Sequence, residues 1–148
     1  MNALGTHDTV RILTLLGVGS DCAAQSKGWR AEYRMTPEER QRGLQRLRLA
    51  SLVQYAFPGS PTLYYGDEAG MEGFEDPFNR RPFPWGSEDR DLTAWYAALG
   101  RARQTLPPLR RGDIQYVRAE DGVLAFTRTW EGDVVLCAAN GGGTPARL

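Results

Sequence analysis

Residues 58–70 read PGSPTLYYGDEAG, a stretch that ends one element, forms a short second one and opens a long loop. Two prolines and a glycine in residues 58–61 stop any preceding helix, because proline lacks a backbone N–H and glycine is a poor helix former. Thr62–Tyr65 have the composition of a strand, and their shortness is typical of a buried parallel strand in a βα repeat. Residues 66–86, rich in glycine and proline, then predict a loop.

A helix is predicted before this strand, over residues 37–57. The Thr36 hydroxyl can accept from a free backbone N–H, the Glu39 carboxylate can reach back, and Pro37 suits the first helical position. Leucines on one side of this helix predict burial. We expect its arginines to form a solvated polar face rather than a basic binding patch: Arg40, Arg42, Arg46 and Arg48.

Shorter signals flank this unit. Residues 1–5 are expected to finish a buried strand, and Asp8 stands where the N-cap of a following helix would be. Residues 17–35 lack sustained periodicity and predict a loop, anchored by Trp29 and Tyr33. A second helix is expected from Asp91, with large apolar residues at helical spacing, until two prolines end it: Leu92, Trp95, Leu99 and Leu106, then Pro107 and Pro108.

The pattern changes after residue 108. Residues 113–119, 123–130 and 133–139 are rich in β-branched and aromatic residues, and short turn signals containing glycine separate them. They predict an antiparallel meander. A domain junction is expected near residues 107–112.

Length and composition narrow the function classes. The 148 residues are too few for a complete (β/α)8 barrel, which needs about 250 residues. Eighteen basic and 18 acidic residues cancel, which disfavours nucleic acid as a partner, and no apolar run is long enough to span a membrane. Cys22 and Cys137 have no metal-ligand spacing, so we expect isolated thiols, no metal site and no cofactor, with the compartment left open.

Thr6-His7-Asp8-Thr9 and the stretch at 58–70, followed by DPFNRRPFPW at 76–85, together resemble the last third of an α-amylase-family glycosidase. The residues around these motifs are similar to those of the neopullulanase and cyclomaltodextrinase branch of that family. This resemblance implies an α/β unit at 1–108, the last two βα repeats of a TIM barrel, and then the opening antiparallel strands of a C-terminal β-sandwich at 109–148. The first residues resemble the inside of a family motif, so the start is expected to be a truncation.

The resemblance also implies site residues. Asp8 corresponds to the family's transition-state-stabilising carboxylate, and His7 to the imidazole that binds the same sugar. Asp76 and Arg80 correspond to a pair that holds the next sugar. Trp85, with Phe83, would either contact a sugar face or pin the loop. Asp67 and Glu68 are adjacent on an extended chain and point to opposite faces, so they make a poor acid and nucleophile pair, and we expect Glu68 to have a structural hydrogen-bonding role.

The family's nucleophile and general acid lie on strands that this sequence lacks. We therefore expect the chain to be inactive alone, and its parent to hydrolyse α-1,4 glucosidic bonds with retention, in maltooligosaccharides, cyclodextrins or pullulan, with cleavage of α-1,6 bonds left open. The expected partners are an oligosaccharide or α-glucan substrate and a second copy of the parent, with no nucleic acid and no membrane. The rival interpretation is a non-catalytic carbohydrate-binding or interaction module.

Overall fold

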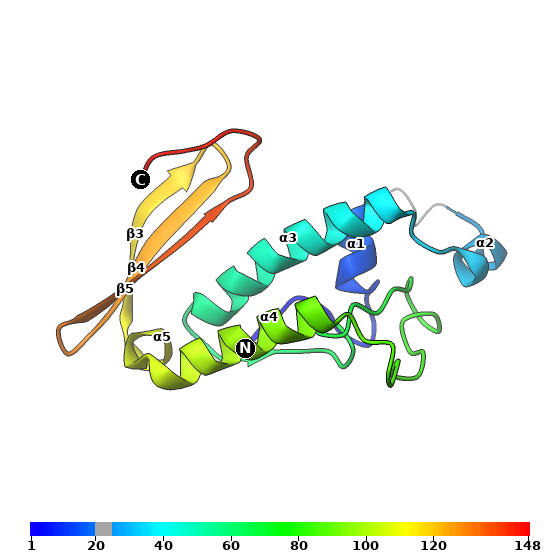
Figure 1. The fold of residues 1–148 in the computed structure, drawn as a ribbon, viewed down its shortest axis with the longest axis horizontal. Helices are drawn as coiled ribbons and strands as arrows, with labels where there is room; N and C mark the ends of the chain where they lie inside the picture. The colour runs from blue at the N-terminus through cyan, green and yellow to red at the C-terminus, as the bar shows by residue number, and fades with distance from the viewer. Residues whose placement is uncertain (20–24) are drawn as a thin grey trace.

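The computed structural model describes residues 1–19 and 25–148. Helices α3 and α4 run side by side, and the three-stranded sheet lies at one end of them (Figure 1). Cys22 lies outside the described residues, whereas Cys137 is a buried free thiol. The elements follow the order β1 (Asn2–Ala3), α1 (Ile12–Val18), α2 (Lys27–Glu32), α3 (Pro37–Ala56), β2 (Pro61–Thr62), α4 (Arg90–Thr105), α5 (Pro107–Arg111), β3 (Asp113–Glu120), β4 (Val123–Trp130) and β5 (Asp133–Asn140).

A short parallel pair joins the two ends of the first 62 residues. Asn2 of β1 pairs with Pro61 of β2, and Ala3 pairs with Thr62. The Gln54 side chain of α3 donates to the backbone oxygens of both Asn2 and Thr62, at 2.9 Å each. Parallel strands joined by a helix make a βα repeat, as the sequence predicted. The strand is displaced from the predicted 62–65, because the chain already turns at Tyr64, whose oxygen accepts from Asp67 N.

Helix α3 begins as its sequence predicted. The Thr36 hydroxyl accepts from Glu39 N, and the Glu39 carboxylate accepts from Thr36 N. This reciprocal pair satisfies two backbone donors that helical bonding leaves free. The helix then runs from Pro37 to Ala56, within one residue of its predicted end.

Arg42, Arg46 and Arg48 of α3 are exposed, as the predicted solvated face requires, and Arg40 is half-buried. Arg40 forms ion pairs with Glu72 and Asp89, at 2.8 and 3.2 Å. Arg42 donates to Gly17 O, and Arg46 to Leu16 O. Both acceptors are carbonyls near the C-terminal end of α1, where no further helical turn supplies a donor. These side chains therefore tie α3 to its neighbours.

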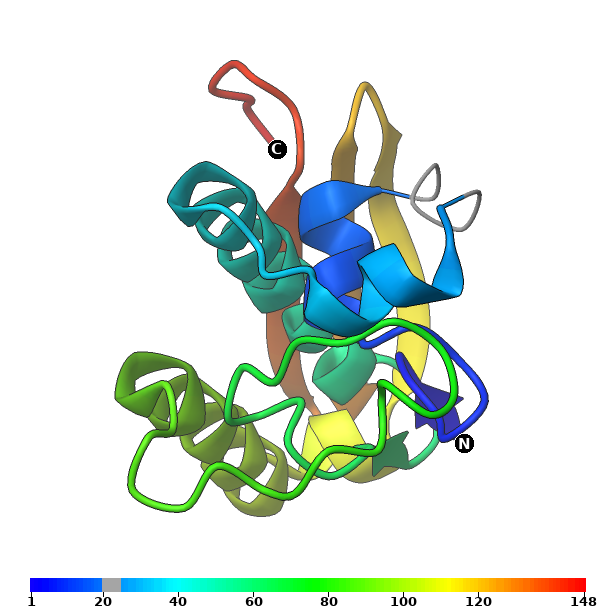
Figure 2. The same cartoon turned by 90° about the vertical axis from the view of Figure 1, so that its right-hand side faces the viewer.

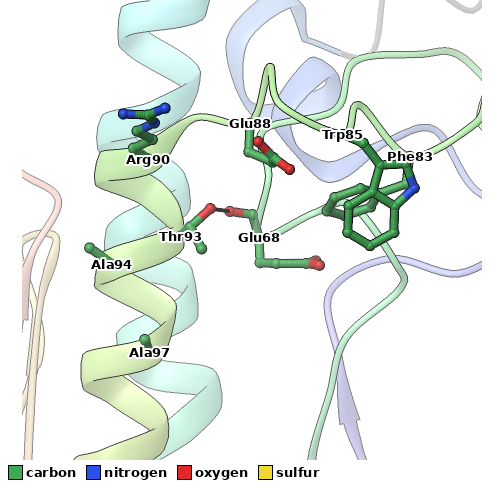
Figure 3. A pocket seen from close by; sticks show the side chains of 8 residues that line it. All are labelled: Glu68, Phe83, Trp85, Glu88, Arg90, Thr93, Ala94 and Ala97. Atoms are coloured by element: carbon green, nitrogen blue, oxygen red, sulfur yellow. Dashed lines mark hydrogen bonds between the residues drawn. The ribbon is translucent and has the colours of Figure 1, made fainter.

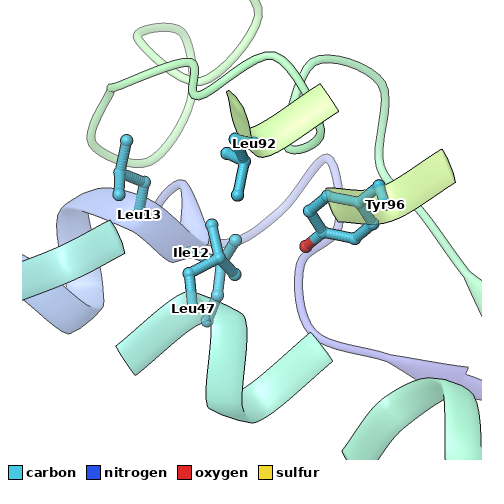
Figure 4. Packing of buried hydrophobic residues seen from close by; sticks show 5 residues of the cluster. All are labelled: Ile12, Leu13, Leu47, Leu92 and Tyr96. Atoms are coloured by element: carbon cyan, nitrogen blue, oxygen red, sulfur yellow. The ribbon is translucent and has the colours of Figure 1, made fainter. Parts of the chain in front are cut away.

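The first hydrophobic core lies between α1, α3 and α4 (Figure 4). Leu13, Leu47 and Leu92, one from each helix, are completely buried. Helix α4 is capped by Asp89, whose carboxylate accepts from Leu92 N at 3.0 Å, so the helix begins just before the predicted Asp91. The predicted loop at 17–35 contains α2, and Trp29 and Tyr33 stack at 4.3 Å beside Phe74, so they anchor this segment as expected.

The meander is confirmed, with strand order β3-β4-β5 and antiparallel pairing throughout. Both hairpins turn through two residues with positive φ, Asp121-Gly122 and Glu131-Gly132. Such turns match the right-handed twist of the strands they join. Phe126 and Cys137 on the inner face pack with Ala56 and Leu109 into a second core.

Figure 2 shows the three-stranded sheet behind the helices. The short strands β1 and β2 lie in the lower part of this view, whereas the turn between β3 and β4 lies at its top. Buried Arg128 of β4 joins the two parts, since its guanidinium donates to Ala56 O at 2.5 Å and to Gly112 O at 2.7 Å. None of the helices in the described part of the chain is long and apolar enough to cross a membrane.

Candidate functional site

The site begins in the tight turn that follows β1. Thr6 N donates to the Thr9 hydroxyl at 3.0 Å, and Asp8 N donates to the Thr6 hydroxyl at 3.2 Å. The two threonines thus fold the chain around His7 and Asp8. The expectation of Asp8 as a helix N-cap is wrong, because α1 begins only at Ile12, with Arg11 in the cap position. The Asp8 side chain is 73% exposed.

Four charged or ionisable side chains meet at this turn. His7 Nε2 lies 3.1 Å from Asp8 Oδ2, and Arg80 Nη2 lies 3.8 Å from Asp8 Oδ1. Arg80 Nε in turn contacts Asp76 Oδ1 at 2.8 Å. Exposed pairs of this kind contribute little to stability, about 1 kcal/mol at most. Their oxygens and N–H groups are accessible to a ligand, and two segments far apart in sequence supply them.

Buried polar groups hold those two segments together. Asn79 is completely buried, and its Nδ2 donates to His7 O and Thr9 O, both at 2.8 Å. Arg11 is 1% exposed, and its Nε donates to Asn79 O at 2.8 Å. Sequence reasoning missed both residues, because Asn and Arg are mostly found at protein surfaces.

Arg11 also organises the exit of β2. Its Nη1 donates to Tyr65 O and forms an ion pair with Asp67 Oδ1, and its guanidinium lies 4.2 Å from the centre of the Tyr64 ring. Burial raises the pKa of Asp67 to about 6, although the neighbouring Arg11 charge acts in the opposite direction. Gly5 is needed here, because a β-carbon at that position would lie 2.9 Å from the Asp67 carboxylate.

Glu68 has the structural bonding expected of it, since its carboxylate accepts from Gly66 N at 2.9 Å. Trp85 is 83% exposed, and its ring stacks on Phe83 at 4.5 Å beside α4. Figure 3 shows the Glu68 side chain extending towards these two rings, in a groove of about 490 Å³ that Ala94 and Ala97 of α4 also line.

Trp85 stands apart from the charged cluster. Within residues 1–19 and 25–148, no hydrogen bond or ring contact joins it to the four side chains His7, Asp8, Asp76 and Arg80. The structure thus brings together four of the five predicted site residues. Likewise, no group of three or more His, Cys, Asp or Glu side chains in these residues is placed to hold a metal ion.

This arrangement suits a neutral, hydroxyl-rich ligand. Carboxylate oxygens accept from hydroxyl groups, a guanidinium donates through a planar fork, and imidazole can do either. The cluster has two carboxylates: Asp8 lies beside the only histidine of the sequence, and Asp76 is paired with Arg80.

Comparison with known proteins gives relatives over most of the chain, although no family model matches it. An amylopullulanase from Thermoanaerobacter thermohydrosulfuricus is 41% identical over 128 residues, which cover 86% of this chain and 8% of that protein. A cyclomaltodextrinase from a Bacillus species is 32% identical over 143 residues, covering 94% of this chain and 21% of the other.

Among solved structures, an α-amylase from Geobacillus thermoleovorans, complexed with acarbose, matches with a TM-score of 0.74 and 30% identity. The match covers 95% of this chain and 27% of that enzyme. The chain therefore spans less than a third of each of these three proteins.

Proposed function

Because the chain belongs to the α-amylase family of glycoside hydrolases, we propose that it is the part of an α-glucan hydrolase that contributes the transition-state-stabilising carboxylate and a neighbouring sugar site. In this proposal β1 and β2 are adjacent strands of the catalytic barrel. Residues 1–108 belong to the barrel, and residues 109–148 open the antiparallel C-terminal domain.

One observation carries the proposal. The family resemblance assigns His7 and Asp8 to one sugar and Asp76 and Arg80 to the next, and the four side chains form a continuous series of contacts between 2.8 and 3.8 Å. The two pairs lie in the loops that follow β1 and β2. Chemistry in barrel enzymes is supplied by such loops at the carboxyl ends of strands.

The proposed mechanism is double displacement with retention at α-1,4 glucosidic bonds, with α-1,6 bonds as an alternative. A retaining enzyme needs a nucleophile and a general acid about 5 to 5.5 Å apart, and its transition state resembles an oxocarbenium ion. Asp8 would accept hydrogen bonds from hydroxyls of the reacting sugar and strengthen them as positive charge develops. His7, 3.1 Å from that carboxylate, would orient it and bind the same sugar.

Arg80 and Asp76 would bind the next sugar, since a guanidinium and a carboxylate offer charge-assisted hydrogen bonds to its hydroxyls. The proposed substrates are maltooligosaccharides, cyclodextrins or pullulan. Trp85 is assigned to the loop beside α4, where it either contacts a more distant part of a long substrate or pins the loop against Phe83.

The chain by itself should be inactive. The His7–Asp8 turn offers one carboxylate, and a covalent step needs two with different roles. We expect no hydrolysis of a nitrophenyl maltoside by the purified 148-residue chain. If the 148-residue chain hydrolyses this substrate and Asp8→Asn abolishes that activity, the proposal that the chain lacks the nucleophile and the general acid is wrong.

The decisive test is Asp8→Asn in a full-length enzyme that contains this chain. Loss of one transition-state interaction should lower kcat/KM by roughly 100- to 1000-fold, mostly through kcat. Asp133→Asn, an exposed carboxylate at the start of β5, is the matched control and should leave both constants unchanged. A rise in KM alone would contradict the role proposed for Asp8.

A further inference from the structure

The loop that carries Asp76 and Arg80 contains one side chain of opposite character. Asp76 and Arg80 are exposed, whereas Asn79 between them has no exposed surface. A primary amide loses water on burial, at a cost of about 1 to 3 kcal/mol unless its polar atoms find partners. The bonds of Asn79 therefore show what the residue does.

Both amide hydrogens of Asn79 form hydrogen bonds, one to the residue before Asp8 and one to the residue after it. Nδ2 donates to His7 O and to Thr9 O, at 2.8 Å each, across sequence separations of 72 and 70 residues. The amide orientation is fixed by this contact, because the alternative would place Oδ1 against two carbonyl oxygens.

The backbone of Asn79 is held as firmly as its side chain. Its carbonyl accepts from Nε of Arg11, a residue that is itself 1% exposed. Oδ1, by contrast, is buried and accepts no hydrogen bond from any described residue. The side chain thus directs both of its donors at the turn that presents Asp8.

The separation of Asp8 and Arg80 depends on this bridge. Their closest atoms are 3.8 Å apart, near the outer limit for an ion pair, and both side chains are substantially exposed, so packing does little to fix them. Arg80 is the next residue after Asn79, and Asp8 is the residue between its two acceptors. Misplacement of a binding group by about 1 Å can lower a rate 100-fold.

We propose that Asn79 is a positioning residue that sets the distance between the His7–Asp8 pair and Arg80, and so couples the reacting sugar to its neighbour. This inference rests on the proposed function, which assigns the two sugars to those side chains. Asn79 itself would touch no substrate.

The test uses Asn79→Ser in a full-length enzyme that contains this chain, alone and combined with Arg80→Ala. We expect kcat on maltoheptaose to fall about 10- to 100-fold at a temperature where the variant is fully folded. The ratio of kcat/KM for maltoheptaose to that for maltotriose should fall as it does in Arg80→Ala. In the double variant that ratio should fall no further than in Arg80→Ala alone, because the two residues would act on one interaction.

The matched control is Asn140→Ser, which removes an exposed asparagine at the end of β5 and should leave kcat and the chain-length ratio unchanged. A variant Asn79→Ser with a lowered Tm but unchanged kinetics would overturn the inference, since the residue would then serve stability alone. Additive effects on the chain-length ratio in the double variant would overturn it as well.

Two further outcomes are informative. If Asn79→Ser does not fold, the test uses Asn79→Gln, which keeps both amide donors on a longer side chain. If neither variant folds, the inference is overturned, because the amide would then be required for folding. A full kinetic loss in Asp8→Asn with none in Asn79→Ser would remove this inference only. No loss in Asp8→Asn would remove the proposed function beneath it.

Discussion

In the proposed function the side chains of the site form two pairs, His7 with Asp8 at the reacting sugar and Asp76 with Arg80 at the next sugar. Arg80 contacts both Asp8 and Asp76, but its closer contact, 2.8 Å, is with Asp76. Hydrogen bonds to charged groups contribute about 1.5 to 3 kcal/mol when solvent is excluded by a ligand. The two contacts therefore predict a binding role that depends on substrate length.

Arg80→Ala in the full-length enzyme should lower kcat/KM for maltoheptaose by roughly 10- to 100-fold and that for maltose-sized substrates much less. Arg101→Ala, an exposed arginine of α4, is the control. Steady-state kinetics on a series of chain lengths measure the effect. Equal losses at every length would mean that Arg80 only holds the loop.

Asp67 predicts a pH dependence of stability. Burial raises its pKa to about 6, from an ordinary value of 3.8, so the folded chain binds the proton more tightly than the unfolded chain. The resulting stability is fully present below about pH 4 and is lost as pH rises through about 6. The groups that act on Asp67 are Arg11, Glu68 and Tyr96.

The unfolding free energy of the 148-residue chain should therefore be larger at about pH 5 than at about pH 7.5, by up to roughly 1.4 kcal/mol. Urea titrations at the two pH values measure it. Asp67→Asn should remove most of the difference, whereas Asp91→Asn, at an exposed position in the first turn of α4, should keep it. An unchanged difference in Asp67→Asn would assign the pH dependence to another group.

The site residues show where sequence reasoning ends. Asp8 and Arg80 were found because their motifs are local strings of residues. Arg11 and Asn79 were not, because their role lies in contacts across more than 60 residues, and a polar residue gives no local sign of burial. The contacts of Arg40 and Arg42 on α3 were not predicted for the same reason, since their acceptors lie on the loop before α4 and on α1.

At the scale of elements, local chemistry decided the boundaries that could be predicted. The reciprocal cap of α3 involves residues three apart, and each turn of the meander involves two adjacent residues, so both could be predicted from the sequence. The strand β2 is shorter than predicted and α2 was missed, because each depends on packing against distant segments.

Thr36→Ala should destabilise the chain by about 1 kcal/mol, because the backbone N–H of Glu39 at the start of α3 loses its acceptor, the Thr36 hydroxyl. Urea unfolding followed by circular dichroism measures the change. Ser87→Ala, at an exposed loop position, is the control. A difference between the two variants below about 0.3 kcal/mol would show that water replaces the cap fully.

At the scale of the whole molecule, apolar surface remains uncovered beside β1. A groove of about 380 Å³ is lined there by residues of β1 and α3 and by residues directly after them, among them Ala3, Val53 and Phe57. Leu63 and Tyr65, just after β2, are 37% and 41% exposed. A barrel covers such surfaces with neighbouring repeats.

The 148-residue chain should therefore associate as its concentration rises. Analytical ultracentrifugation measures this, and Val53→Gln should weaken it while Leu106→Gln, at the junction of α4 and α5, should not. A monomer at all concentrations, with slow amide exchange at residues 62–65, would show that the groove needs no covering.

Arg128 sets a limit on how this molecule can be recombined. Its buried guanidinium donates hydrogen bonds to carbonyls at the end of α3 and before β3. This one side chain therefore bonds the meander to the helices. A chimera that joins these helices to a meander from another protein inherits two unsatisfied carbonyls unless the donor strand brings its own arginine to that register. Compatible parents for such grafts can thus be chosen by inspecting one position.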